Sequence, residues 1–134
     1  MRRMLVAALA ALLLLAAPAF AGNGITPLSP KRGDTVPEGS RPVFKGKVKG
    51  RGPVWIHVCP SPRKNARGLI CTRDAVVRTH RRGARFSVKA PFFDFPGFWL
   101  NRPSTYYWQA HRISCERGLG DCRLEGPVVR FRVG

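Results

Sequence analysis

The residues of this chain with the widest scope for acid–base chemistry are its three histidines, His57, His80 and His111. Imidazole changes charge near neutral pH, so two of them held close together could act as acid and base, as in a small secreted ribonuclease. His57 and His111 are expected on the outer faces of neighbouring strands, where they could approach one another. No nucleophile elbow, phosphate-binding glycine loop or metal motif accompanies them. A basic hydrolase is therefore the alternative hypothesis, and no catalytic residue is predicted.

Four cysteines offer a second kind of chemistry. They lie at Cys59, Cys71, Cys115 and Cys122. Neither a C-x-x-C pair nor a His-x-x-x-His pair is present to build a zinc site, so we expect no metal and no cofactor. An even number of cysteines in an exported chain favours disulfides.

Export itself is predicted by residues 1–21. Arg2 and Arg3 provide a positive start, an apolar run follows from Leu5 to Ala17, and Ala19-Phe20-Ala21 fits a signal peptidase site. The apolar run is too short to span a hydrocarbon core of ~30 Å at ~1.5 Å per helical residue. We expect a cleaved signal peptide and a secreted or envelope-associated protein with no transmembrane segment in its mature form.

The charge of the chain indicates the kind of partner it attracts. Lys and Arg number 24 against seven Asp and Glu, for a formal net charge of +17. Such a charge attracts anionic surfaces. The sequence therefore favours an anionic cell-envelope polymer or glycan as the partner, with nucleic acid bound only non-specifically. A general bias toward arginine is the alternative explanation.

Short runs of alternating apolar and polar residues indicate the fold class. Phe44, Gly46 and Val48 alternate with lysines, and Val129, Phe131 and Val133 alternate with arginines. Gly and Pro turns separate about seven such runs, and this pattern is typical of two antiparallel sheets packed as a sandwich. We expect an irregular lead-in and first edge strand at residues 22–40, and the remainder of one domain at residues 41–134.

Two segments carry a resemblance to a known family. Arg41–Gly46 followed by Pro53–Val58 resembles the second and third strands of exported bacterial Ig-like domains. Thr105–Ala110 followed by Gly126–Phe131 resembles the last two strands of fibronectin type III domains. The resemblance covers most of residues 25–134 and implies an Ig-like or fibronectin type III-like β-sandwich. Such domains serve as spacers, adhesins and binding modules, so the fold does not define a function.

The sandwich makes two structural predictions. Cys59 and Cys115 should end antiparallel neighbouring strands at opposite poles, which leaves two local disulfides, Cys59–Cys71 and Cys115–Cys122. Tyr106, Trp108 and Ala110 should point inward, and their predicted core companions are Phe44, Val48, Val54, Ile56, Phe86, Val88, Val129 and Phe131.

The same register predicts one candidate binding face. Its members should face solvent on three neighbouring strands, and they are Trp55, His57, Tyr107, Gln109, His111, Arg130 and Arg132. Aromatic faces beside guanidinium groups suit an acidic glycan. Basic clusters at Arg63–Arg67 and Arg81–Arg85 should lie at opposite poles of the sandwich, which favours a diffuse positive field over one dedicated patch. The role of an aromatic segment, Phe92–Trp99, stays open: it is either a lid on the core or an interaction patch.

Overall fold

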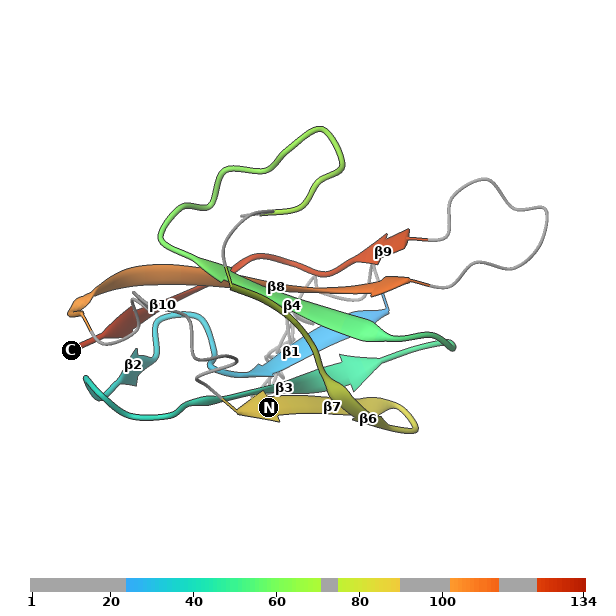
Figure 1. Ribbon diagram of the computed structural model, residues 1–134, viewed down its shortest axis with the longest axis horizontal. Coiled ribbons are helices and arrows are strands. Elements are labelled where there is room, and N and C mark those ends of the chain that lie inside the picture. The colour runs from blue at the N-terminus through green and yellow to red at the C-terminus, as the bar shows by residue number, and fades with distance from the viewer. Residues whose placement is uncertain (1–23, 71–74, 90–101, 114–122) are drawn as a thin grey trace, which may run out of the picture.

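The structure, a computed structural model, describes residues 24–70, 75–89, 102–113 and 123–134 (Figure 1). These residues form ten strands and no helix, which confirms the all-β prediction. The predicted signal peptide, the aromatic segment at residues 92–99, and Cys71, Cys115 and Cys122 lie outside the described residues. Among the described residues no helix has the length and apolar character that crossing a membrane requires.

One sheet has four strands, all paired antiparallel. Its order is β1 (Ile25–Ser29), β3 (Val43–Val48), β7 (Arg85–Lys89) and β6 (His80–Arg82). Strand β3 shows why the sheet has two unlike faces. Phe44, Gly46 and Val48 are buried, and Val43, Lys45 and Lys47 are exposed at the alternate positions, because successive side chains of a strand point to opposite faces.

The other sheet has six strands. Along its main path lie β2 (Thr35–Val36), β10 (Val129–Val133), β8 (Ser104–Ile113), β4 (Val54–Cys59) and β5 (Ala75–Arg78), and β9 (Arg123–Glu125) also pairs with β8. Strands β4, β8 and β10 are neighbours, as predicted. The expectation of purely antiparallel sheets is wrong at one pair, since β2 runs parallel to β10. The lead-in thus supplies an edge strand to each sheet.

The chain crosses between the two sheets at Thr79. Strand β5 pairs with β4 in the six-stranded sheet, and β6 pairs with β7 in the four-stranded sheet one residue later. The amide of Thr79 donates to the Val54 carbonyl at 2.9 Å, so the crossing stays attached to the start of β4. Figure 1 shows this segment running along one side of the sandwich.

A single apolar core fills the space between the sheets. Trp108 of β8 and Phe44 of β3 meet edge to face across it, with ring centroids 5.5 Å apart. Every predicted inward residue is buried or, like Val88, packed against the core. The buried cluster contains Ile25, Phe44, Val48, Val54, Ile56, Val58, Val77, Phe86, Tyr106, Trp108, Ala110, Val129, Phe131 and Val133.

The strand register yields a prediction about the disulfides. Cys59 lies opposite Tyr107, whereas Ile113 lies at the other end of β8, about 20 Å away at ~3.3 Å per residue. Ile113 precedes Cys115 by two residues and pairs with Arg123, which follows Cys122. We therefore expect Cys115 to bridge Cys122 and Cys59 to bridge Cys71, because Cα atoms joined by a disulfide lie within ~7 Å.

Non-reducing tryptic mapping tests this pairing. Trypsin cuts between the two cysteines of each predicted pair, at Arg63, Lys64, Arg67 and Arg117. Each bridge should therefore join two peptides that separate on reduction. We expect each bridge to contribute about 2.5–3 kcal/mol to stability. A peptide joining Cys59 to Cys115 or Cys122 would contradict the pairing.

Candidate functional site

The predicted binding face exists as a set of neighbours, but its centre is not on the surface. Cα pairing joins Trp55 with His111, His57 with Gln109, and Tyr107 with Arg130 on the outer face of the six-stranded sheet. The predicted exposure is wrong at three positions: His57 is 3%, Gln109 0% and His111 6% exposed. Trp55 and Tyr107 are half-buried, and Arg130 and Arg132 are exposed as expected. No continuous exposed face joins these residues.

The face is covered by two segments of the chain that the Gln109 side chain binds. Its Oε1 accepts from the Ile70 amide at 3.0 Å, and its Nε2 donates to the carbonyls of Gly68 and Gly126, both at 3.0 Å. Both amide hydrogens and the acceptor are therefore used, which makes burial of this polar side chain tolerable. The residue attaches two segments to the sheet: the loop after β4 and the link between β9 and β10.

The loop after β4 folds back because of its own sequence. Asn65 Oδ1 accepts from the amides of Arg67 and Leu69, and Gly68 adopts a φ of +74°, which favours glycine. Leu69 and Ile70 then lie buried, at 6% and 0% exposure. This apolar pair in an otherwise polar loop could have indicated from the sequence that the loop folds over the sheet and covers its outer face.

Under this cover His57 and His111 form a close pair. His57 Nε2 lies 2.7 Å from His111 Nδ1, and the ring centroids are 4.6 Å apart. The predicted approach of the two histidines is thus confirmed, although their predicted place on the surface is wrong. A hydrogen bond of this kind needs one N–H and one lone pair, so the contact is incompatible with a proton on both nitrogens.

The environment of the pair disfavours a charged imidazole. Burial, followed by the charges of His57 and Arg123, lowers the pKa of His111 to about 4. The ring is therefore neutral at pH 7 and enclosed by protein. These properties fit a structural contact better than the surface acid–base pair on which the hydrolase hypothesis depends.

A row of basic residues crosses the outer face of the four-stranded sheet. Lys47 of β3 lies opposite Arg85 of β7, and Arg85 lies opposite Arg82 of β6. All three are exposed, and so are Lys45 of β3 and Lys49, which directly follows this strand. Neighbouring strands are ~4.8 Å apart, so the Cα atoms of the three residues lie within roughly 10 Å of one another. Sequence reasoning found the lysines and the arginines separately, but it missed the register that aligns them.

The second basic cluster lies elsewhere. Arg63, Lys64 and Arg67 are exposed on the loop that leaves the far end of β4. The turn between β6 and β7 lies beside the start of β4, since Arg81 binds the carbonyl of Gly52. The two clusters are therefore at opposite ends of the molecule, as predicted, and the loop cluster is available as a matched control for the sheet face.

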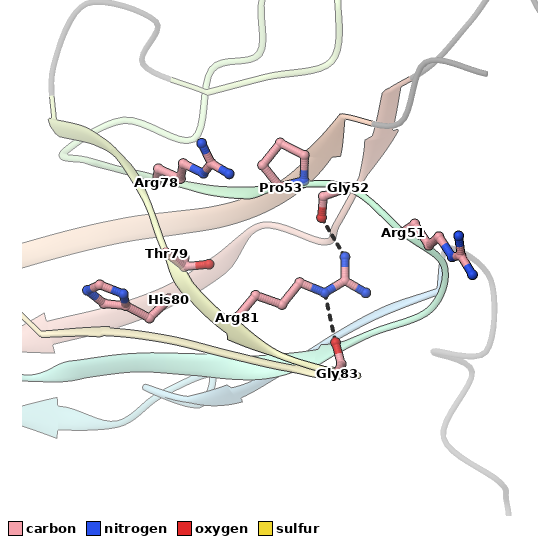
Figure 2. Close-up of a pocket in the computed structure, with 8 residues that line it drawn as sticks. All are labelled: Arg51, Gly52, Pro53, Arg78, Thr79, His80, Arg81 and Gly83. Atoms are coloured by element: carbon pink, nitrogen blue, oxygen red, sulfur yellow. Dashed lines mark hydrogen bonds between the residues drawn. The ribbon is translucent and has the colours of Figure 1, made fainter. Parts of the chain in front are cut away.

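A cleft of about 810 Å³ opens beside the crossing between the sheets (Figure 2). The described residues that line it are Arg51, Gly52, Pro53, Arg78, Thr79, His80, Arg81 and Gly83. None of these is acidic or a Phe, Tyr or Trp. They come from the turn before β4 and from the crossing itself, two segments that are 25 or more residues apart in the sequence. For that reason no local motif predicted the cleft.

Arg81 is fixed by backbone carbonyls. Its Nε donates to Gly83 O at 2.8 Å, and one terminal nitrogen donates to Gly52 O at 2.5 Å (Figure 2). The other terminal nitrogen donates to Gly50 O. A guanidinium has five N–H groups, so two remain. Its partners here are neutral, and its positive charge therefore stays available to an anion.

Thr79 contributes an unusual group to the same cleft. The residue is 8% exposed, and its Oγ1 has no hydrogen-bond partner among the described residues. Figure 2 shows the hydroxyl directed toward the side on which the Arg81 guanidinium lies, and the oxygen itself is enclosed by protein. A buried polar group without a partner costs ~1–3 kcal/mol.

The described residues contain no group of three His, Cys, Asp or Glu side chains that could hold a metal ion. Comparison of the chain with protein-family models, with curated proteins and with solved structures finds no match. The arrangement of charges and hydrogen-bonding groups is therefore what indicates the function.

Proposed function

We propose that this chain is an exported, disulfide-stapled Ig-like or fibronectin type III-like module that binds an anionic polymer at the cell envelope or outside the cell and has no catalytic activity. The strand order supports the fold assignment. Strands β1, β3, β7 and β6 follow the order of one immunoglobulin sheet, and β10, β8 and β4 follow that of the other. The signal-like residues 1–21 support export.

The observation that carries the proposal is the row Lys47–Arg85–Arg82. Like charges directly opposite one another destabilise a sheet, each pair by roughly 0.2–1 kcal/mol. Strands β3, β6 and β7 contain no acidic residue that could offset the repulsion. An anionic polymer supplies the missing counter-charges, and a repeating anion can contact all three cations together.

The apolar surface argues against a folded protein as the main partner. Protein interfaces are built around a buried apolar centre. Among the described residues, Val43 is the large apolar side chain that is exposed, at 39%. Electrostatic contact with a polymer needs no such centre.

Binding to dextran sulfate across a salt series tests the proposal. The sheet variant carries Lys47→Gln, Arg82→Gln and Arg85→Gln, and the loop control carries Arg63→Gln, Lys64→Gln and Arg67→Gln, so both lose three charges. We expect the sheet variant to lose affinity far more than the control, with the slope of log Kd against log salt falling by about 2–3. Its melting temperature should stay the same or rise, because the repulsion is removed.

Two results would contradict the proposal. If the unmodified protein does not bind dextran sulfate at physiological salt, it is not a polyanion-binding module. If the loop control loses as much affinity as the sheet variant, the charge acts as a diffuse field and the row has no special role.

A further inference from the structure

We propose that the cleft at the β5–β6 crossing binds one oxyanion, a sulfate or carboxylate, of an anionic polysaccharide. Arg78, Arg81 and Thr79 provide the contacts. This inference rests on the proposed function, because it names the class of the polymer and the site that binds one of its charged groups. Sulfate and carboxylate share the recognising chemistry, in which oxygen lone pairs accept from guanidinium N–H groups and a hydroxyl.

The Arg81 guanidinium is preorganised for binding an anion in the cleft. It is held by the carbonyls of Gly50, Gly52 and Gly83, so little side-chain freedom is lost when an anion arrives. The two N–H groups that remain can serve the ligand. These neutral carbonyls orient the cation without neutralising its charge, and the described residues that line the cleft include no acidic side chain.

Thr79 supplies independent support for a ligand. A buried hydroxyl normally has a hydrogen-bond partner, but Thr79 is 8% exposed and its Oγ1 has none among the described residues. Its backbone amide is already bonded to Val54 O, so the strand crossing does not depend on the hydroxyl. The oxygen is enclosed in the free protein, so an oxyanion in the cleft would accept the hydroxyl hydrogen only as neighbouring side chains shift on binding.

Arg78 completes the site from the end of β5. It is exposed, and Figure 2 shows its guanidinium on the Pro53 side of the cleft, across from that of Arg81. Two cations on opposite sides of one cleft, without a carboxylate among the described lining residues, favour a ligand of negative charge.

The lining favours a polysaccharide over a nucleic acid. Proteins that hold single-stranded nucleic acid without sequence preference stack its bases on aromatic side chains. The described lining residues include no Phe, Tyr or Trp. The turn residues Gly52 and Gly83 instead let a polymer backbone come close to the protein main chain.

Three single variants of the mature protein test the site. Thr79→Val keeps the shape of the side chain and removes only the hydroxyl; Arg78→Gln removes one charge in the cleft. Arg63→Gln removes one charge at the opposite end and is the matched control. Kd is measured for dextran sulfate, for polygalacturonate and for a single-stranded oligonucleotide at one salt concentration, and the melting temperature is measured for each variant.

We expect Arg78→Gln to weaken polysaccharide binding about tenfold and Thr79→Val about three- to fivefold, with little effect of Arg63→Gln. Thr79→Val should melt at the same temperature or higher, because the hydroxyl has no partner among the residues that the structure describes. A combination of weaker binding and unchanged stability would separate a ligand contact from a structural role. Greater sensitivity with dextran sulfate assigns the site to sulfate, and greater sensitivity with polygalacturonate assigns it to carboxylate.

Other outcomes would overturn the inference. If both cleft variants behave like Arg63→Gln while the polysaccharides still bind, the cleft is not the oxyanion-binding site, although the proposed function stands. If the oligonucleotide binds as tightly and with the same sensitivity, the ligand class is wrong. If no polymer binds the unmodified protein, the proposed function fails together with the inference.

Discussion

Replacement of Trp108 by alanine is expected to lower the free energy of unfolding by about 3–5 kcal/mol. The side chain is fully buried at the centre of the core and meets Phe44 edge to face. Its Nε1 also donates to the Pro30 carbonyl at 2.9 Å, so truncation removes a hydrogen bond as well as packing. For a domain of this size, thermal denaturation should show a fall in Tm of roughly 15–25 °C.

A Trp108→Phe variant separates the two contributions. Phenylalanine keeps most of the ring packing and loses the indole N–H, so we expect a smaller loss, of about 1–2 kcal/mol. Equal losses in both variants would show that the hydrogen bond to Pro30 dominates. An unchanged Tm in Trp108→Ala would contradict the placement of this ring in the core.

The success of the core prediction has a simple physical basis. Side chains alternate between the faces of a strand, so the register of β8 follows from the pattern around Tyr106, Trp108 and Ala110. The alternation also identified which face of β3 and of β10 is apolar. The parallel pairing of β2 with β10 was missed, since a strand of only two residues has too little pattern to reveal its partner.

The candidate binding face failed for a different reason. Alternation shows which side chains leave the core, but it does not show what lies above them. Gln109 points away from the core as predicted, and it is nevertheless fully buried because Ile70 and Gly126 are bound to its amide. The cation row and the cleft were missed because they depend on pairings between distant segments, such as Lys47 with Arg85.

Acidification is expected to destabilise the protein through the buried histidine pair. The pKa of His111 is lowered from 6.5 to about 4 by burial and by the charges of His57 and Arg123. The unfolded chain therefore binds a proton in the window between pH 6.5 and pH 4, whereas the folded chain does not. The stability that depends on the neutral His111 ring should be fully present above pH 6.5. It should be lost as the pH drops toward 4, by about 3 kcal/mol in total at ~1.4 kcal/mol per pKa unit.

Denaturant unfolding at pH 7 and pH 4.5 measures this loss. Carboxylates also titrate in this range, so the informative quantity is the difference between variants. His111→Gln removes the titrating ring, and its loss of stability on acidification should be smaller than that of the unmodified protein by about 2 kcal/mol. His80→Gln removes an exposed histidine and should behave like the unmodified protein.

A direct measurement tests this prediction even if His111→Gln folds poorly. In an NMR titration of the unmodified protein, the His111 ring resonance should remain in its neutral position down to about pH 5 and shift only as the pH approaches 4. A ring that titrates near its ordinary value would show that water reaches the pair. The cover over His57 and Gln109 would then be open in solution, and the surface on which the hydrolase hypothesis depends would be restored.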